Sequence, residues 1–228
     1  MKNKTMNKTA LIVAGGSGTR MESNLPKQFL LLARKPILMR TIEAFYNSGV
    51  NQIVLVLPQS QIEFWNQLCL THQFTIQHQI VAGGASRFES VQNGLQHCND
   101  NDLVAIHDGV RPFISKEIIT LSFDTAAQKG NAVAAVRLKD SIRKVELLSN
   151  KNVNRDNYYL IQTPQTFKAN LIKEAYAAQD HINFTDDASV LESNGHAINL
   201  IAGDYKNIKI TTPEDLLVGE AFLSNKTR

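Results

Sequence analysis

Cysteine is scarce in this chain of 228 residues, and long apolar runs are missing. The two cysteines, Cys69 and Cys98, form no CxxC pair, so they can build neither a disulfide framework nor a zinc cluster. The richest apolar stretches, 29–33 and 53–57, are far shorter than the roughly 20 residues that a membrane-spanning helix needs. The apolar stretch behind the N-terminal lysines is also too short for a signal peptide. We therefore expect a protein of the reducing cytoplasm that has no membrane partner.

A strong charge of one sign is missing as well. Lys and Arg number 24 and Asp and Glu number 21, so the formal net charge is only +3. This excess is too small to make nucleic acid the expected partner, and the lysines of the N-terminal tail have no aromatic residues among them. Chemistry that needs cations must therefore use a local cluster of them.

Short apolar runs rich in β-branched residues alternate with longer segments of helical period. This order is typical of an α/β fold, in which helices cover both faces of a mostly parallel sheet. The runs are almost wholly apolar, as expected of strands that are buried on both faces. The predicted strands are 10–14, 52–57, 76–81, 103–107, 132–136 and 198–201.

Three helix boundaries are marked in the sequence. Apolar residues at helical spacing over 38–45 predict a helix that ends at Gly49. Ser86 and Glu89 have the spacing of a capping box, so a helix should begin there. Pro213, followed by two acidic residues, predicts the start of the last helix, where the helix dipole favours negative charge.

The segment 139–163 breaks the alternation. Its mixed polar and apolar residues predict a hairpin arm around a turn at 149–152. An isolated hairpin is marginal in water, so we expect the arm to pack on something, and a second subunit is the natural candidate. The chain has no internal repeat and no Pro/Gly-rich linker, so we interpret 1–228 as a single domain with this arm.

A glycine-rich loop follows the first predicted strand. Gly15, Gly16 and Gly18 lack Cβ atoms, so their backbone N–H groups can approach a phosphate chain closely, and Arg20 and Lys27 add positive charge nearby. The loop is neither GxxxxGK[ST] nor GxGxxG. On its own it fits a phosphate site and an ordinary βα turn about equally well.

Further motifs follow other predicted strands, where ligands bind in open α/β sheets. They are AGGASRFESV, HDGVRPF and NIKITTPEDL, joined by LPKQF and RDNYYLIQTPQTF. With these motifs in this order over about its whole length, the chain resembles the bacterial 2-C-methyl-D-erythritol 4-phosphate cytidylyltransferases, the IspD family. The resemblance implies a Rossmann-like nucleotidyltransferase fold. It also implies an enzyme that transfers CMP from CTP to 2-C-methyl-D-erythritol 4-phosphate, releases pyrophosphate, requires Mg²⁺ and serves isoprenoid precursor synthesis.

The same resemblance implies roles for individual residues. Arg20 and Lys27 match the family's transition-state stabilisers. Asp108 would lie near the ribose and is the candidate metal ligand. The nucleotide would contact Ala14, Gly15, Gly16, Gly84, Ser90 and Asp108. The acceptor would contact Arg155, Thr185 and Lys209, with Arg155 reaching into the neighbouring site of a homodimer.

Other interpretations remain open at this stage. Asp108 could cap a turn, and Lys209 and Arg155 could be solvated charges. Ala85 stands where some family members carry an acidic residue, which puts a side-chain contact to cytidine from that position in doubt. The alternative functions are a ribitol-5-phosphate cytidylyltransferase and, in another class, a nucleotide sensor without catalysis.

Overall fold

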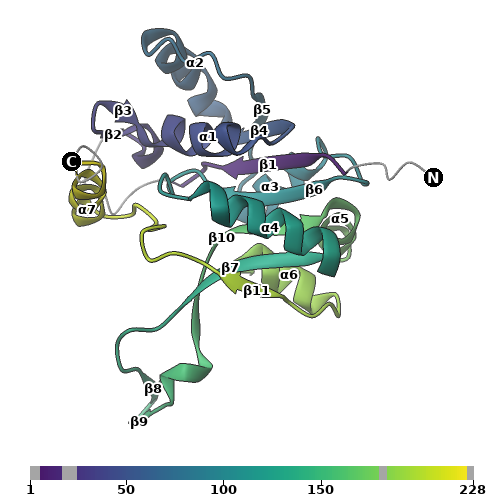
Figure 1. The fold of residues 1–228 in the computed structure, drawn as a ribbon, viewed down its shortest axis with the longest axis vertical. Coiled ribbons are helices and arrows are strands. Elements are labelled where there is room, and N and C mark those ends of the chain that lie inside the picture. The colour runs from purple at the N-terminus through teal and green to yellow at the C-terminus, as the bar shows by residue number, and fades with distance from the viewer. Residues whose placement is uncertain (1–5, 17–24, 180–183, 225–228) are drawn as a thin grey trace.

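The computed structural model describes residues 6–16, 25–179 and 184–224. Its main sheet has seven strands in the order β11-β7-β10-β6-β1-β4-β5 (Figure 1). Only β10 runs antiparallel to its neighbours, so the predicted mostly parallel α/β sheet is confirmed. In chain order the strands are β1 (Lys8–Val13), β4 (Gln52–Leu57), β5 (Gln79–Ala82), β6 (Leu103–Asp108), β7 (Asn131–Arg137), β10 (Tyr159–Lys168) and β11 (Leu200–Ala202).

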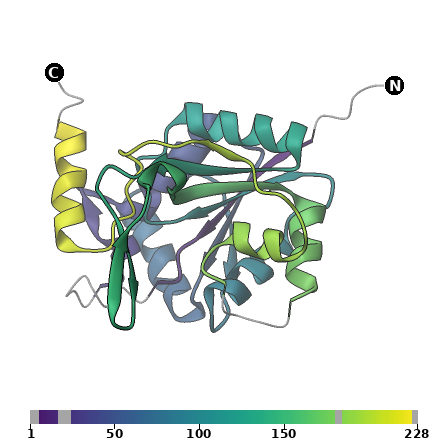
Figure 2. The same ribbon diagram turned by 90° about the horizontal axis from the view of Figure 1, so that it is seen from below.

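Helices cover both faces of this sheet, as Figure 2 shows from below. On one face lie α1 (Ile37–Ser48), α2 (Ile62–Thr71) and α4 (Lys116–Lys129). On the other lie α3 (Arg87–Leu95), α5 (Ala169–Ala177) and α6 (Asp187–Ser193). Each face has its own hydrophobic core. Along β1, Ile12 packs into the core under α1, α2 and α4, and Leu11 packs into the core on the opposite face, because side chains of a strand alternate between faces. None of the helices in the described ranges is both long and apolar enough to cross a bilayer.

The remaining elements are short or peripheral. Helix α7 (Pro213–Ser224) packs against the sheet's flank, where a Cβ on Gly219 would lie 3.1 Å from both Leu32 and Phe113. Asp215 accepts hydrogen bonds from the backbone N–H groups of Thr211 and Thr212 and so caps this helix. The other pieces are η2 (Lys27–Phe29), β2 (Leu31–Leu32), β3 (Lys35–Pro36), η3 (Gln59–Gln61) and η4 (Arg155–Asn157).

The predicted helix boundaries have the expected local causes. Gly49 takes a left-handed conformation (φ 85°) directly after α1, where a side chain would be strained. The Ser86 side chain accepts a hydrogen bond from the Glu89 backbone N–H at the start of α3. The return bond of the capping box is displaced by one residue, because the Glu89 carboxylate accepts from the N–H of Ala85 at 2.7 Å.

Strand β10 is the element that the sequence pattern missed. It lies in the middle of the sheet, yet it carries Gln162, Thr163, Gln165 and Thr166 in place of an apolar run. All four side chains are buried and hydrogen-bonded; Gln165, for example, donates to Asp186 and accepts from the N–H of Ala188. A polar composition therefore hid a core strand.

The predicted arm is shorter than 139–163 and turns at a different place. Residues 159–161 pair with β7 in the main sheet, so that end of the segment belongs to the sheet. The separate hairpin consists of β8 (Arg143–Glu146) and β9 (Ser149–Asn152), in which Glu146 pairs with Ser149. The turn is therefore at 147–148 and not at 149–152. The hairpin extends away from the sheet, and every residue of its strands is exposed (Figure 1).

Candidate active site

The carboxyl ends of neighbouring parallel strands bring distant segments together at one edge of the sheet. Residues 14–16 follow β1, residues 83–86 follow β5, and Asp108 ends β6. These segments line a cavity of about 290 Å³. Lys27 and Lys209, which lie 182 positions apart in the sequence, line the same cavity. This is the place where open α/β sheets bind their ligands.

The structure brings together every predicted nucleotide-contacting residue that it describes. The cavity is lined by Ala14, Gly15, Gly16, Gly84, Ser90, Asp108 and Lys27, and by Ala85 at the position of the noted departure. A Cβ on Gly16 would lie 3.1 Å from the Lys27 Cε, so the glycine leaves room for the lysine stem. Arg20 lies outside the described residues, so its predicted role stays a prediction.

The loop between β5 and α3 is held in a tight turn by Ser90. The Gly84 N–H donates to the Ser90 hydroxyl (3.1 Å), which in turn donates to the Ser86 carbonyl (2.8 Å). A Cβ on Gly83 would lie 2.8 Å from that hydroxyl oxygen, which a real side chain does not tolerate. The cavity wall is thus shaped before any ligand binds.

Asp108 sits at the centre of a charged cluster. Its Oδ2 lies 3.0 Å from the Lys209 Nζ and 3.2 Å from the Arg111 Nε. Burial by itself would raise the pKa of Asp108, but the charges of Lys209, Arg87 and Arg111 outweigh it and hold the pKa well below its usual range. The carboxylate is therefore ionised at neutral pH.

His107, beside Asp108, is held by hydrogen bonds at both ring nitrogens. Its Nε2–H donates to the Arg111 carbonyl (3.1 Å), which leaves Nδ1 to accept from the Thr163 hydroxyl (3.1 Å). The Thr163 oxygen accepts from the Asp108 N–H (3.1 Å). Burial lowers the pKa of His107 to about 4, so the ring is neutral and holds the end of β6 in place.

A second cavity of about 400 Å³ adjoins the first. The two share three lining residues, Arg87, Asp108 and Lys209. Thr185 also lines the second cavity, so two of the three predicted acceptor contacts, Thr185 and Lys209, lie together there. Arg111 lines it too, so three cationic side chains face this cavity together with the carboxylates of Asp108 and Asp186.

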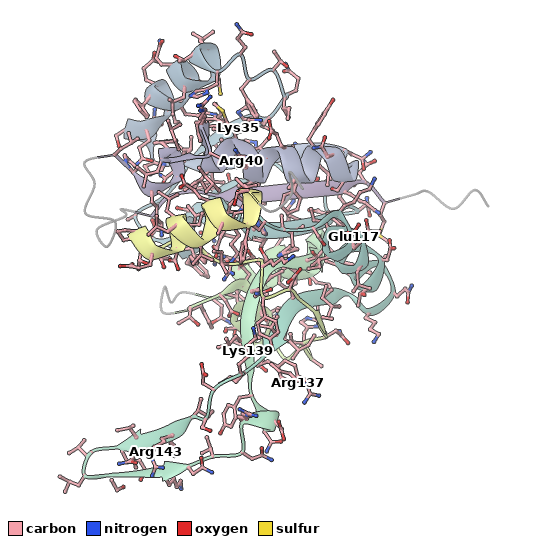
Figure 3. The ribbon with its side chains drawn as sticks, turned by 60° about the vertical axis from the view of Figure 1, so that its left-hand side comes forward. Lys35, Arg40, Glu117, Arg137, Lys139 and Arg143 are labelled. Carbon is pink, nitrogen blue, oxygen red and sulfur yellow. The ribbon has the colours of Figure 1, made fainter. Side chains whose placement is uncertain are left out.

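Arg155, the third predicted acceptor contact, is not brought to these cavities. It lies in η4 in the arm region, is exposed, and donates to the Lys139 carbonyl. Figure 3 shows Lys139 and Arg137 near the root of the arm and Arg143 farther out on it. A role for Arg155 in catalysis therefore needs a site other than that of its own chain.

Sequence reasoning overlooked two arginines of this region. Arg111 follows Asp108 by three residues inside the quoted HDGVRPF motif, and that spacing was an available signal. Arg87 stands inside the quoted AGGASRFESV motif, yet its partner Asp187 is 100 positions away. Asp186 caps α6 by accepting a hydrogen bond from the Ser189 N–H, whereas Asp187 is wholly buried in a salt bridge with Arg87.

The residues present also fit a divalent cation shared with a ligand. Among the described residues no group of three or more His, Cys, Asp or Glu side chains could enclose a metal ion. Asp108 nevertheless lines the cavity, and its Oδ1 has no hydrogen-bond partner among those residues. Mg²⁺ in proteins is commonly held by one or two carboxylates together with substrate phosphates. A single carboxylate beside a phosphate-sized cavity meets that requirement.

Comparison with known proteins agrees with this geometry. The model of the family described as 2-C-methyl-D-erythritol 4-phosphate cytidylyltransferase (IspD) matches residues 8–225. The protein of that name from Bacteroides fragilis is 48% identical over 219 residues, which are 96% of this chain and 100% of the relative. The solved 4-diphosphocytidyl-2C-methyl-D-erythritol synthase from Anaerococcus prevotii superposes with a TM-score of 0.82 at 28% identity, covering 96% of this chain and 99% of that one. The 2-C-methyl-D-erythritol 4-phosphate cytidylyltransferase of Thermus thermophilus gives 0.80 at 28% identity, covering 96% and 100%. This chain belongs to the IspD family.

Proposed function

We propose that this chain is a cytidylyltransferase that transfers CMP from CTP to 2-C-methyl-D-erythritol 4-phosphate. The products are 4-diphosphocytidyl-2-C-methyl-D-erythritol, an isoprenoid precursor intermediate, and pyrophosphate. One observation carries the proposal: two adjoining cavities share Arg87, Asp108 and Lys209 in a chain of the IspD family. The first cavity is assigned to the nucleotide and the second to the acceptor, so the new bond forms at their shared wall.

The nucleotide side supplies backbone donors and a buried cation. Gly15 and Gly16 line the cavity without side chains, so their backbone N–H groups can approach phosphate oxygens closely, whereas the Gly84 N–H is used by Ser90. The Lys27 ammonium is assigned to the triphosphate, where it stabilises the charge that grows on the leaving pyrophosphate. Arg20 is assigned the same task by the family resemblance.

The reaction is a displacement at the α-phosphorus of CTP. A phosphate oxygen of the acceptor forms the new P–O bond, and the bond to the pyrophosphate oxygen breaks. The acceptor phosphate is already anionic, so no residue has to act as a strong general base. Lys209 and Thr185 hold the acceptor, and Asp108 keeps the Lys209 ammonium at the shared wall (3.0 Å).

The family is generally dependent on a divalent metal, and we assign Mg²⁺ to Asp108 and the CTP phosphates. When bound, the ion supplies positive charge to the phosphate oxygens. The carboxylate that would hold it is ionised at neutral pH, for the reasons given above.

We further propose a cytoplasmic homodimer in which the arm of one chain completes the site of the other. Two features support the dimer and a third supports the compartment. Arg155 lies outside its own chain's cavities. The arm presents the apolar side chains Val145, Leu147 and Leu148, which are 77–102% exposed. The two cysteines are free thiols, which suits a reducing compartment. The single-domain interpretation of 1–228 stays a prediction.

The alternative functions are not favoured. The relatives described above carry the methylerythritol name, and none carries that of a ribitol-phosphate enzyme. A sensor without catalysis does not need the second cavity with its three cationic side chains.

A pyrophosphate-release assay tests the proposal. The protein is mixed with CTP, Mg²⁺ and either 2-C-methyl-D-erythritol 4-phosphate or ribitol 5-phosphate. Release with the first acceptor, and loss of release on adding a chelator, is expected. Faster turnover with ribitol 5-phosphate, or tight CTP binding with no pyrophosphate from either acceptor, would overturn it.

A further inference from the structure

We infer that Arg87 is a further substrate-binding residue, that it binds the phosphate group of the acceptor, and that Asp187 and Tyr176 are the residues that position it. The inference deepens the proposed function and rests on it. It comes from a salt bridge that lies behind the shared wall of the two cavities and that the mechanism above does not use.

Arg87 is held by a carboxylate on another element. It is the first residue of α3, and Asp187 is the first residue of α6. Nη1 of Arg87 lies 2.9 Å from Oδ1 of Asp187, and Nη2 lies 2.7 Å from Oδ2. This two-pronged geometry fixes the plane of the guanidinium, which a single lysine ammonium could not do.

The carboxylate is itself fixed from behind. The Tyr176 hydroxyl donates to Oδ1 of Asp187 at 2.7 Å. Tyr176 is only 2% exposed, and its ring stacks on Phe88 with centroids 4.5 Å apart. Burial opposes the charge on Arg87, but the Asp187 carboxylate outweighs it, so the pKa of Arg87 lies above its usual value. The guanidinium is therefore charged and rigidly placed.

Arg87 faces the two cavities, but its partner Asp187 does not. The Arg87 side chain is 30% exposed and lines both cavities, whereas the Asp187 side chain is 0% exposed and lines neither. The other two cations of the second cavity differ in this respect, because Lys209 and Arg111 both pair with Asp108, which faces the cavities itself. Among these three cations, Arg87 is therefore the one whose counter-ion does not line a cavity.

The Arg87 guanidinium also has N–H groups that its pair with Asp187 does not use. Of its five N–H groups, the pair with Asp187 uses two, and the described residues supply no hydrogen-bond acceptor for the others. A phosphate monoester offers several anionic oxygens and suits such a planar donor. At the shared wall, the group that must be held in line with the nucleotide is the phosphate of the acceptor.

The test compares Arg87→Lys and Tyr176→Phe with Arg40→Lys as a matched control. Arg40 is also an arginine with two hydrogen bonds, to the carbonyls of Leu32 and Ala33, but it lies on α1 and lines neither cavity (Figure 3). For each protein we would measure the acceptor's dissociation constant by calorimetry, without turnover. The KM values for acceptor and CTP would be measured separately.

The expected result is a split between the two substrates. Arg87→Lys should weaken acceptor binding and raise the acceptor KM by about tenfold or more, as the loss of a charge-assisted hydrogen bond does, with the KM for CTP changed less than about twofold. Tyr176→Phe should shift the acceptor constants in the same direction by a smaller factor, and Arg40→Lys should leave them unchanged. An unchanged acceptor affinity in Arg87→Lys, equal rises in both KM values, or no binding of the acceptor by the unaltered chain would overturn the inference.

The calorimetric measurement separates this inference from the proposed function. If the unaltered chain releases no pyrophosphate but Arg87→Lys still loses acceptor affinity, the proposed function fails and the binding role of Arg87 stands. If the unaltered chain turns over and Arg87→Lys behaves like it, the function stands and the role of Arg87 fails.

Discussion

The carboxyl edge of the sheet and the arm both carry charged residues that the family resemblance associates with substrate, but the chain supports them in different ways. Asp108 contacts Lys209 and Arg111 and is anchored by Thr163 from β10. Arg155 on the arm side contacts one backbone carbonyl and lies among exposed residues. The structure of one chain is enough to infer the role of a residue that several elements hold in place. For a residue on an exposed arm, the role can be inferred only when the surface that the arm contacts is known.

The largest loss of stability is expected at Asp108, in the well-anchored part of this comparison. Replacing Asp108 with Asn leaves Lys209 and Arg111 without their buried counter-charge, which typically costs about 3–5 kcal/mol of unfolding free energy. Asp124→Asn is the matched control, because its pair with Lys8 is 3.6 Å long and Asp124 is 58% exposed, so less than about 1 kcal/mol should be lost. Urea unfolding of both variants measures the difference. Equal losses would mean that the cluster around Asp108 is no stronger than a surface pair.

Lys27→Ala should act on turnover more than on folding. Removing one preorganised cation from the transition state typically costs about 10²–10³-fold in kcat, or about 2.7–4 kcal/mol. Lys35→Ala serves as the control, because Lys35 pairs with Glu43 (2.6 Å) and lines neither cavity. Steady-state kinetics and urea unfolding should be run on both variants. A loss of stability in Lys27→Ala as large as its loss of activity would make Lys27 a structural group.

His107 predicts a pH dependence of stability. Its pKa is about 4 in the folded chain, against an ordinary value of about 6.5 when unfolded. As the pH falls from about 6.5 to 4, the unfolded chain binds a proton at His107 that the folded chain does not, so the unfolding free energy falls by about 3 kcal/mol. Above pH 6.5, His107 is neutral in both states and costs no stability.

Unfolding free energies at pH 7 and pH 4 measure this slope. His107→Gln should flatten it. Phe45→Leu, which removes a ring 4.9 Å from the His107 ring, should lower stability at both pH values and keep the slope. A His107→Gln protein with the unaltered slope would show that other groups carry the pH dependence.

The smallest expected effect is on the arm. Arg155→Ala should change unfolding free energy by no more than about 0.5 kcal/mol, since the residue is exposed. It should raise the acceptor KM about tenfold if the arm reaches a neighbouring site, because a charge-assisted hydrogen bond is lost. Arg143→Ala, also on the arm, is the control (Figure 3). A monomer in analytical ultracentrifugation together with an unaffected Arg155→Ala enzyme would remove the inter-subunit role.

The limits of sequence-based prediction are clearest at β10. The apolar runs of β1, β4, β6 and β7 predicted those strands because both faces of each are buried. In strand β10 the buried stretch, residues 162–167, is mostly polar, since its side chains bond to groups on other elements, as Gln165 does with Asp186. Nothing local to 159–168 reveals those partners.

The candidate site divides in the same way. The glycine loops were predictable because each follows a strand, and strand ends converge in an open sheet. Lys27 was predicted from its place shortly after the first loop and from the family resemblance. The pairing of Arg87 with Asp187 was not predictable, since the two residues lie 100 positions apart and meet only when α3 and α6 pack on the same face.

By itself, then, the sequence determined the alternation of strands and helices, most of their boundaries, and which short segments line the first cavity. These are matters of periodicity and of backbone freedom over a few residues. Tertiary structure alone decided which charges neutralise one another around Asp108, which cation keeps its counter-ion out of the cavities, and that the arm leaves its own chain's site. Electrostatic pairing depends on distance in space, and only the packed sheet and helices set that distance.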